Sequence, residues 1–186
     1  MGVLLEAEDL EAGYVMPVVG PISFAVREGE VIGLRGANGT GKSTLLNAIG
    51  NSARILGGRL WRAEGLRIAY QEQHPVRLSE MPLTAGEFLH FAQADQEVVP
   101  ARLRPWLGER VDRLSGGQFQ LLSTWAALAT ECDLVILDEP ANNLDPDGEA
   151  MLAAILRSEM GRRAVLIVSH EHDFLRNSCS RLIEIA

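Results

Sequence analysis

One short segment combines glycines, a lysine and hydroxyl side chains in an order that suits the binding of phosphate groups. The segment GANGTGKST, residues 36–44, fits the pattern G-x-x-x-x-G-K-[ST]. In this pattern backbone N–H groups surround phosphate oxygens, and the N-terminus of the following helix adds partial positive charge. Lys42 would reach the β- and γ-phosphates of a nucleotide, and Ser43 would ligate Mg²⁺. The candidate binding residues are Gly36, Asn38, Gly39, Thr40, Gly41, Lys42, Ser43 and Thr44.

A pair of acidic residues supplies the second half of this chemistry. Asp138 and Glu139 follow the apolar segment LVIL, at the C-terminal end of an expected strand, where α/β sheets place ligand groups. Asp138 would hold the Mg²⁺ shell, and Glu139 would polarise water as a general base beside the γ-phosphate. A chance glycine-rich loop and a strand that ends in a solvated turn are the alternatives. The presence of both motifs in one chain favours the phosphate-transfer interpretation.

The elements that must position these residues alternate between strand and helix. Thr84, followed three residues later by Glu87, predicts a capping box at one helix start. Unbroken apolar strands that alternate with helices predict an α/β fold, a P-loop NTPase core whose mostly parallel sheet is covered on both faces. We also expect antiparallel strands at the N-terminus. The expected strands are 30–36, 66–71, 133–139 and 164–170, and the expected helices are 41–50, 84–94, 116–130 and 145–160.

Length and composition indicate one domain with an ordinary globular core. The chain has 186 residues, of which 47% are hydrophobic. Prolines at 75, 82, 100 and 105 interrupt the alternation, so residues 74–114 are expected to form a small inserted helical lobe. Residues 1–73 and 115–186 would form the nucleotide-binding core. The two cysteines show no metal-type spacing and are expected to be buried, reduced thiols.

The charge of the chain argues against a nucleic-acid partner. The formal net charge is −8, whereas a general polyanion binder more often carries a basic face. Apolar runs such as AVLIV are too short to span a bilayer, and the acidic N-terminus lacks the order of a signal peptide.

Five motifs in a fixed order give the sequence a specific resemblance. GANGTGKST, LSGGQ, LDEP, NNLD and SH follow one another along the chain, and together they resemble the ATP-binding cassette (ABC) ATPase family over essentially its whole length. The resemblance implies an ATPase that uses ATP and Mg²⁺ and works as a head-to-tail dimer. In such a dimer LSGGQ of one cassette closes over the nucleotide of the other, with glycines that let backbone approach phosphate. The residues of this signature are Ser115, Gly116, Gly117 and Gln118; a loop with a capping serine is the alternative.

The resemblance also assigns roles outside the central motifs. Tyr14 resembles the aromatic residue that stacks on adenine, although a strand-packing role is the alternative. Gln73 matches the Q-loop glutamine that contacts Mg²⁺ and the attacking water, with Gln71 as the competing choice. Asp145 matches the D-loop that crosses to the partner cassette, and His170 matches the histidine that touches the γ-phosphate. The catalytic contacts would be Glu139, His170 and Gln73, and the Mg²⁺ contacts would be Ser43, Gln73 and Asp138.

The sequence departs from the family pattern just after the signature. Family members usually carry arginines where this chain has Leu121 and Ala126. Those arginines are mainly structural neighbours of the site, so this departure concerns local packing more than activity. Trp125 is the candidate to fill the space.

Two functional classes fit this resemblance. The segment LRIAYQEQHPVRLSEMPLTAGEFL resembles the Q-loop region of zinc/manganese importer ATPases, which predicts a transporter subunit at the cytoplasmic face of a membrane. A short helix of its transmembrane permease would enter the groove between Gln73 and the inserted lobe. The alternative is a non-transport, ribosome-associated ABC protein, because SHEHDFL resembles the ending of that class. Residues 74–113 hold six acids against five arginines, which gives no face for ribosomal RNA.

Overall fold

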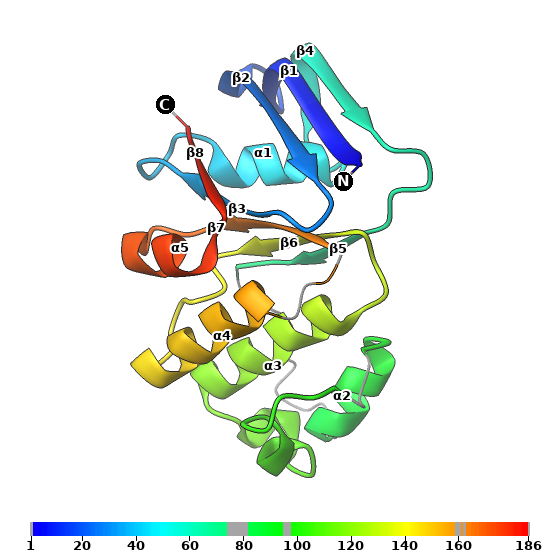
Figure 1. Ribbon diagram of the computed structural model, residues 1–186, viewed down its shortest axis with the longest axis vertical. Helices are drawn as coiled ribbons and strands as arrows, with labels where there is room; N and C mark the ends of the chain where they lie inside the picture. Colours follow the sequence, from blue (N-terminus) through cyan, green and yellow to red (C-terminus); the bar gives the residue numbers. More distant parts are fainter. Residues whose placement is uncertain (1, 74–81, 95–97, 159–160, 162, 186) are drawn as a thin grey trace.

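A five-stranded parallel sheet forms the centre of the computed structural model, which describes residues 2–73, 82–94, 98–158, 161 and 163–185 (Figure 1). Its strand order is β5-β6-β7-β3-β8, and every neighbouring pair is parallel. Strands β6 and β7 are buried along their whole length, as their unbroken apolar sequences predict. The bounds are β3 Val31–Arg35, β5 Ile68–Gln71, β6 Leu134–Asp138, β7 Ala164–Val168 and β8 Arg181–Glu184.

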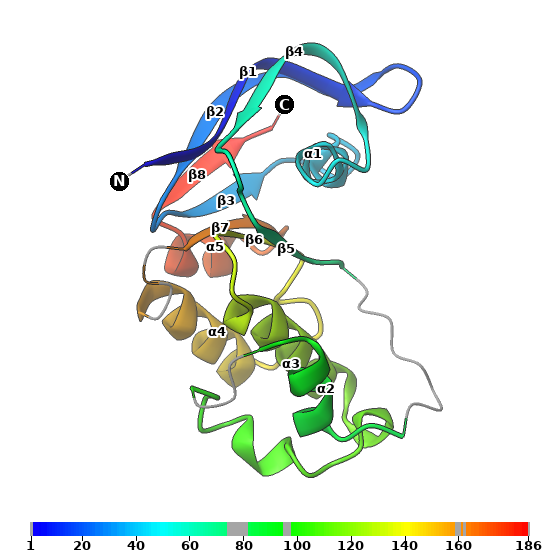
Figure 2. The ribbon, with the colours of Figure 1, turned by 90° about the vertical axis from the view of Figure 1, so that its right-hand side faces the viewer.

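An antiparallel sheet of three strands, in the order β2-β1-β4, lies apart from the parallel sheet. Helix α1 (Lys42–Ile49) runs between the two sheets, and its leucines pack with residues of both (Figure 2). The antiparallel strands are β1 Val3–Gly13, β2 Pro17–Arg27 and β4 Arg54–Arg62. The expected fold class is therefore confirmed, N-terminal antiparallel strands included.

Three helices cover the other face of the parallel sheet: α3 (Gly116–Ala129), α4 (Pro146–Ser158) and α5 (His172–Ser178). Beyond them lies helix α2 (Ala85–Phe91), followed by short 3₁₀ turns. Phe88 of α2 meets Phe119 of α3 edge to face, with ring centroids 5.8 Å apart. Parts of the proposed helical lobe, residues 74–81 and 95–97, lie outside the described residues, so its boundaries stay a prediction.

The capping box expected at the start of α2 is present. The Thr84 hydroxyl accepts a hydrogen bond from the Glu87 backbone N–H at 3.2 Å, and Glu87 Oε2 accepts one from the Thr84 N–H at 2.8 Å. The helix is shorter than expected, because Gln93 adopts a left-handed conformation with φ 56° and the chain turns there.

Three elements were not expected from the sequence: β4, α5 and β8. Strand β4 contains two adjacent glycines and is largely exposed, so it lacks an alternating apolar pattern. Of the two cysteines, Cys132 is buried, as expected, and Cys179 is partly buried. Burial raises the pKa of the Cys179 thiol to about 12. No helix in the described residues is long and apolar enough to cross a membrane.

Candidate active site

The loop between β3 and α1 is shaped by two glycines that its own neighbours require. A Cβ atom on Gly36 would lie 2.5 Å from the carbonyl oxygen of Ile185. A Cβ atom on Gly41 would lie 2.7 Å from Val19 Cβ, and Gly41 also has φ 86°. Gly41 caps α1 without any side-chain hydrogen bond, so the first N–H groups of the helix are left for an anion.

Lys42 folds back over this loop. Its Nζ atom donates hydrogen bonds to the carbonyl oxygens of Gly36 and Ala37, each at 2.8 Å, and the residue is only 7% exposed. Within the described part of the chain it forms no salt bridge. A nearly buried cation whose hydrogen bonds go to neutral carbonyls suits an anionic ligand such as a phosphate.

Asp138 stands opposite this lysine at the end of β6. Burial raises the pKa of Asp138, a hydrogen bond with the Ser43 side chain lowers it, and the neighbouring Glu139 charge raises it further. Its Oδ1 atom is buried and has no hydrogen-bond partner among the described residues. An unpartnered carboxylate oxygen beside a serine hydroxyl is the donor set that Mg²⁺ prefers, so these residues fit the ion.

Glu139 is held in one orientation by His170, two residues after the end of β7. Its Oε2 atom accepts a hydrogen bond from the His170 backbone N–H at 3.2 Å and lies 2.9 Å from His170 Nδ1. Glu139 itself has φ 51°, a left-handed conformation that non-glycine residues adopt rarely. The expected strand 133–139 therefore ends one residue early. The turn at Glu139 directs its side chain along the sheet edge towards β7.

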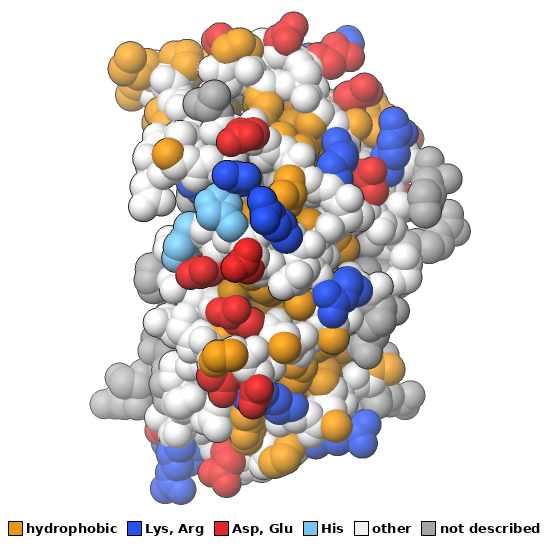
Figure 3. Space-filling model, turned by 60° about the vertical axis from the view of Figure 1, so that its left-hand side comes forward, with side chains coloured by type: hydrophobic (Ala, Val, Ile, Leu, Met, Phe, Trp, Pro, Cys, Tyr) orange, Lys and Arg blue, Asp and Glu red, His pale blue; other side chains and the backbone are white. Residues whose placement is uncertain are grey.

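Lys42, Ser43, Asp138 and Glu139 line one groove of about 390 Å³, whereas His170 does not line it. Asp138, Glu139 and Gln73 face the loop residues across it, and the lining from the loop consists of Asn38, Gly39, Gly41, Lys42, Ser43 and Thr44. Figure 3 shows a face of the molecule on which histidine side chains lie among Lys, Arg, Asp and Glu side chains. Gly36 and Thr40 do not line the groove; the Thr40 hydroxyl donates to the Ala37 carbonyl at 3.0 Å. The loop thus divides into residues that face a ligand and residues that hold its shape.

The two competing glutamines lie in different places. Gln73 lines the groove of about 390 Å³, and its contact with Mg²⁺ stays a prediction. Gln71 is buried, and its Oε1 atom accepts a hydrogen bond from the Thr124 hydroxyl at 3.3 Å. Tyr14 is half exposed on the turn between β1 and β2, and its hydroxyl accepts from Asn47 of α1 at 3.1 Å. Val18 of the same hairpin lines the groove, whereas Tyr14 does not.

The signature residues do not line the groove of their own chain. Ser115 and Gln118 form a capping box at the start of α3, with hydrogen bonds of 2.8 and 3.1 Å. A Cβ atom on Gly117 would lie 2.7 Å from the Asn143 carbonyl oxygen, whereas one on Gly116 would meet no atom within 4 Å. Ser115 therefore caps α3, and Gly116, unlike Gly117, is not required sterically by its own chain.

Sequence reasoning missed the side-chain contacts of Arg102 and Gln120 near this site. Arg102 forms an ion pair with Asp145, and Gln120 reaches the carbonyl oxygens of Glu139 and Pro140 at 3.4 and 3.5 Å. Trp125 is buried in the core beside the sheet, together with the residues at the two missing arginine positions. The partner of Arg102 is 43 residues away in sequence, and no local pattern indicates such a pair.

Comparison with known proteins decides the family. Residues 19–142 match the family model described as "ABC transporter". The chain belongs to this family, as the five motifs predict, and it is an ATP-binding protein that hydrolyses ATP.

Several relatives carry a metal in their names. The zinc import ATP-binding protein ZnuC of Cereibacter sphaeroides is 38% identical over 175 residues, which cover 89% of this chain and 72% of the relative. ZnuC of Paracoccus denitrificans is 35% identical over 191 residues, covering 97% and 75%. The uncharacterized ABC transporter ATP-binding protein YfmM of Bacillus subtilis is 31% identical over 177 residues, covering 92% of this chain but 34% of that one.

Solved structures agree with the fold. A structure titled "Structure of ATP binding subunit of ABC transporter" superposes with a TM-score of 0.81 at 27% identity and covers 98% of this ABC ATPase and 85% of that chain. A structure titled as a putative ABC transporter ATP-binding protein from Pyrococcus furiosus has the same fold, with a TM-score of 0.83 at 22% identity. The superposition covers 97% of this chain and 96% of that chain. The names of the relatives agree with the transporter prediction and do not favour the ribosome-associated alternative.

Proposed function

We propose that this chain is the ATP-hydrolysing subunit of a metal-ion importer, which works as a head-to-tail dimer bound to a permease on the cytoplasmic face of the membrane. The observation that carries the proposal is the phosphate groove, in which Lys42 faces Asp138 and Glu139. The relatives named as zinc import proteins support a divalent metal ion as the transported substrate.

The residues of the groove divide the work of hydrolysis. Lys42 and the free N–H groups of α1 bind the β- and γ-phosphates. Mg²⁺ bound by Ser43, Asp138 and Gln73 would neutralise charge on the phosphate oxygens. Glu139 takes the proton of the attacking water through Oε1, since Oε2 is occupied by His170. Tyr14 stacks on the adenine from the hairpin above α1.

The second half of the site would come from another copy. Gly116 is exposed and has open space beside it, so a phosphate or backbone from a partner can approach closely. Since the signature does not line the groove of its own chain, a head-to-tail arrangement gives both segments a ligand.

The variant Ser115→Arg tests this arrangement. We expect ATP binding to the monomer, measured by fluorescence titration, to stay within about twofold of normal, while hydrolysis falls at least about 100-fold. The rate per molecule of the wild-type protein should also rise with protein concentration as dimers form. If the variant loses ATP binding as severely as hydrolysis, the signature acts within its own chain and the dimer proposal fails.

The permease would bind a second, larger groove of about 780 Å³. It lies between the end of α1, strand β5 and helices α2 and α3, with Gln71, Glu72 and Phe88 in its lining. An apolar hollow of about 560 Å³ adjoins it through Phe88, and the Phe91 side chain there is 70% exposed. A short amphipathic helix of the permease could fill the groove and cover Phe91.

Phe91→Ser tests this docking surface. We expect basal ATP hydrolysis to be unchanged, whereas co-purification with the permease and uptake of radioactive zinc should fall at least about tenfold. Val98→Ser is the matched control, because Val98 is also exposed in the proposed lobe but lines neither groove. Equal effects of the two variants would exclude this surface, and normal uptake of manganese without zinc would revise the substrate.

A further inference from the structure

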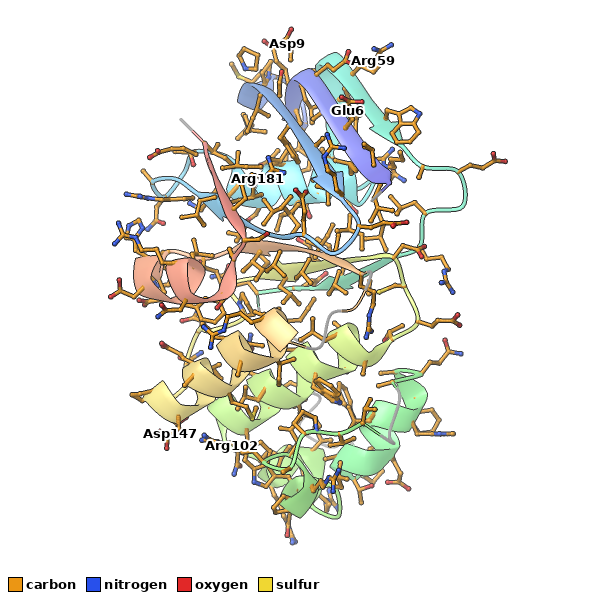
Figure 4. The ribbon with its side chains drawn as sticks, viewed as in Figure 1. Glu6, Asp9, Arg59, Arg102, Asp147 and Arg181 are labelled. Atoms are coloured by element: carbon orange, nitrogen blue, oxygen red, sulfur yellow. The ribbon has the colours of Figure 1, made fainter. Side chains whose placement is uncertain are left out.

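An ion pair joins the proposed helical lobe to the loop that follows the catalytic residues. Arg102 Nη2 lies 3.0 Å from Oδ1 and 3.0 Å from Oδ2 of Asp145. Arg102 comes just before the 3₁₀ turn Arg104–Trp106, and Asp145 immediately precedes α4. In Figure 4, Arg102 lies near the end of α4 that carries Asp147. The contact therefore connects two segments that are 43 residues apart in sequence.

The Asp145 carboxylate is fixed by its own chain on both sides. Its Oδ1 atom also accepts a hydrogen bond from the Gly148 backbone N–H at 2.7 Å, so Asp145 caps α4. A residue expected to reach the partner cassette thus has both oxygens engaged by Arg102 and one also by the helix start. Its orientation depends on where Arg102 is placed.

The loop between Glu139 and Asp145 is short and internally bonded. The Asn142 N–H donates to the Glu139 carbonyl at 3.1 Å, and the Leu144 N–H donates to the Ala141 carbonyl at 3.1 Å. The Asn143 carbonyl lies directly against Gly117 of the signature. These contacts give a continuous path from Asp145 both to Glu139 and to the start of α3.

We infer that Arg102 is a positioning residue, which ties the lobe to the 139–145 loop and so sets the geometry of Glu139 and of the signature. The inference rests on the proposed function, because the same lobe carries Phe88 and Phe91 of the docking surface. Arg102 would thereby relay the position of the lobe to the phosphate groove. The side chains of the pair are 33% and 62% exposed, so its contribution to folding stability is small and its role is geometric.

A double-mutant cycle on the full chain tests this role. Arg102→Gln removes the charge, and Asp145→Asn removes the pair while its amide oxygen still caps Gly148. We expect each variant to lower kcat for ATP about tenfold with KM within about twofold, because misplacement costs rate more than binding. The double variant should be no slower than either single one, and Arg102→Lys should recover part of the rate.

Arg110→Gln is the matched control. Arg110 pairs with Asp112 at 2.6 Å in the same part of the chain, with side chains 43% and 20% exposed, but not with the 139–145 loop. It should stay within about twofold of the wild type in rate. Three results would each overturn the inference. They are equal rate losses in Arg102→Gln and Arg110→Gln, rate losses that multiply in the double variant, and a rise in KM that accounts for the whole loss of kcat/KM.

The outcome is separable from that of the proposed function. Wild-type hydrolysis that is independent of protein concentration would contradict the proposed dimer. A non-additive double-mutant cycle would still support the positioning role of Arg102. Hydrolysis that depends on protein concentration, together with an additive cycle, would contradict the positioning role of Arg102 and leave the proposed dimer in place.

Discussion

Two glycine-containing segments stand at helix starts in this ABC ATPase, and they differ in how the chain supports them. The 36–41 loop leaves the start of α1 without a side-chain cap, and both of its motif glycines are required by neighbours within the chain. The signature has its helix start capped by Ser115 and Gln118, and only Gly117 is sterically required. The first segment is shaped entirely by its own chain, whereas the second leaves open space beside Gly116, where we propose that a partner approaches.

The largest expected effect belongs to the groove that the 36–41 loop forms with Asp138 and Glu139. Glu139→Gln should lower hydrolysis about 1,000-fold, because an amide cannot take a proton from water, and should leave ATP binding near normal. The variant should accumulate as an ATP-bound dimer, which size-exclusion chromatography with ATP would measure. Glu171→Gln is the control, since the Glu171 carboxylate lies 3.3 Å from Nε2 of His170 and does not line the phosphate groove. Near-normal turnover by Glu139→Gln would remove Glu139 as the base.

Lys42→Arg should have the second-largest effect. All 16 other basic residues are arginine, yet here a compact ammonium fits between two carbonyl oxygens at 2.8 Å, and a planar guanidinium is too bulky. We expect ATP affinity to fall at least about tenfold. Amine-reactive labelling should modify only Lys42 and the N-terminus, and MgATP should protect Lys42 alone. Labelling of Lys42 that does not change with saturating nucleotide would contradict its contact with phosphate.

The two signature glycines should separate folding from catalysis. Gly117→Ala places a Cβ 2.7 Å from a backbone oxygen, so it should lower the free energy of unfolding by about 1–3 kcal/mol. Gly116→Ala meets open space and should leave the melting temperature unchanged, but it should lower hydrolysis in the dimer. Thermal unfolding and ATPase rates measure both. A Gly116→Ala protein with full activity would show that no partner approaches this glycine.

The smallest effect compares two capping boxes. Ser115→Ala and Thr84→Ala should each lower the free energy of unfolding by about 1 kcal/mol, since both side chains cap a helix. Only Ser115→Ala should also lower ATP hydrolysis, because we propose that the start of α3, and not of α2, faces a partner's nucleotide. Chemical denaturation and ATPase assays distinguish the two variants. If both variants lose hydrolysis equally, Ser115 acts only as a helix cap.

Local patterns predicted the elements whose sequences carry their own signals. The buried strands β3, β6 and β7 are unbroken apolar runs, and the capping box of α2 is a four-residue motif. Strands β4 and β8 are mostly exposed, and α5 has only seven residues, so their stability comes from tertiary contacts that no short window contains.

The sequence by itself determined the family and the chemistry of this protein, because phosphate binding needs a fixed local order of glycines, lysine and serine at a helix start. Tertiary structure alone decided which glutamine reaches the phosphate groove, how His170 orients Glu139, and that Arg102 pairs with Asp145. Each of these contacts joins side chains from segments that are distant in sequence. Residue spacing in the sequence gives no information on the distances between these side chains. The packing of α3, α4 and the sheet sets those distances.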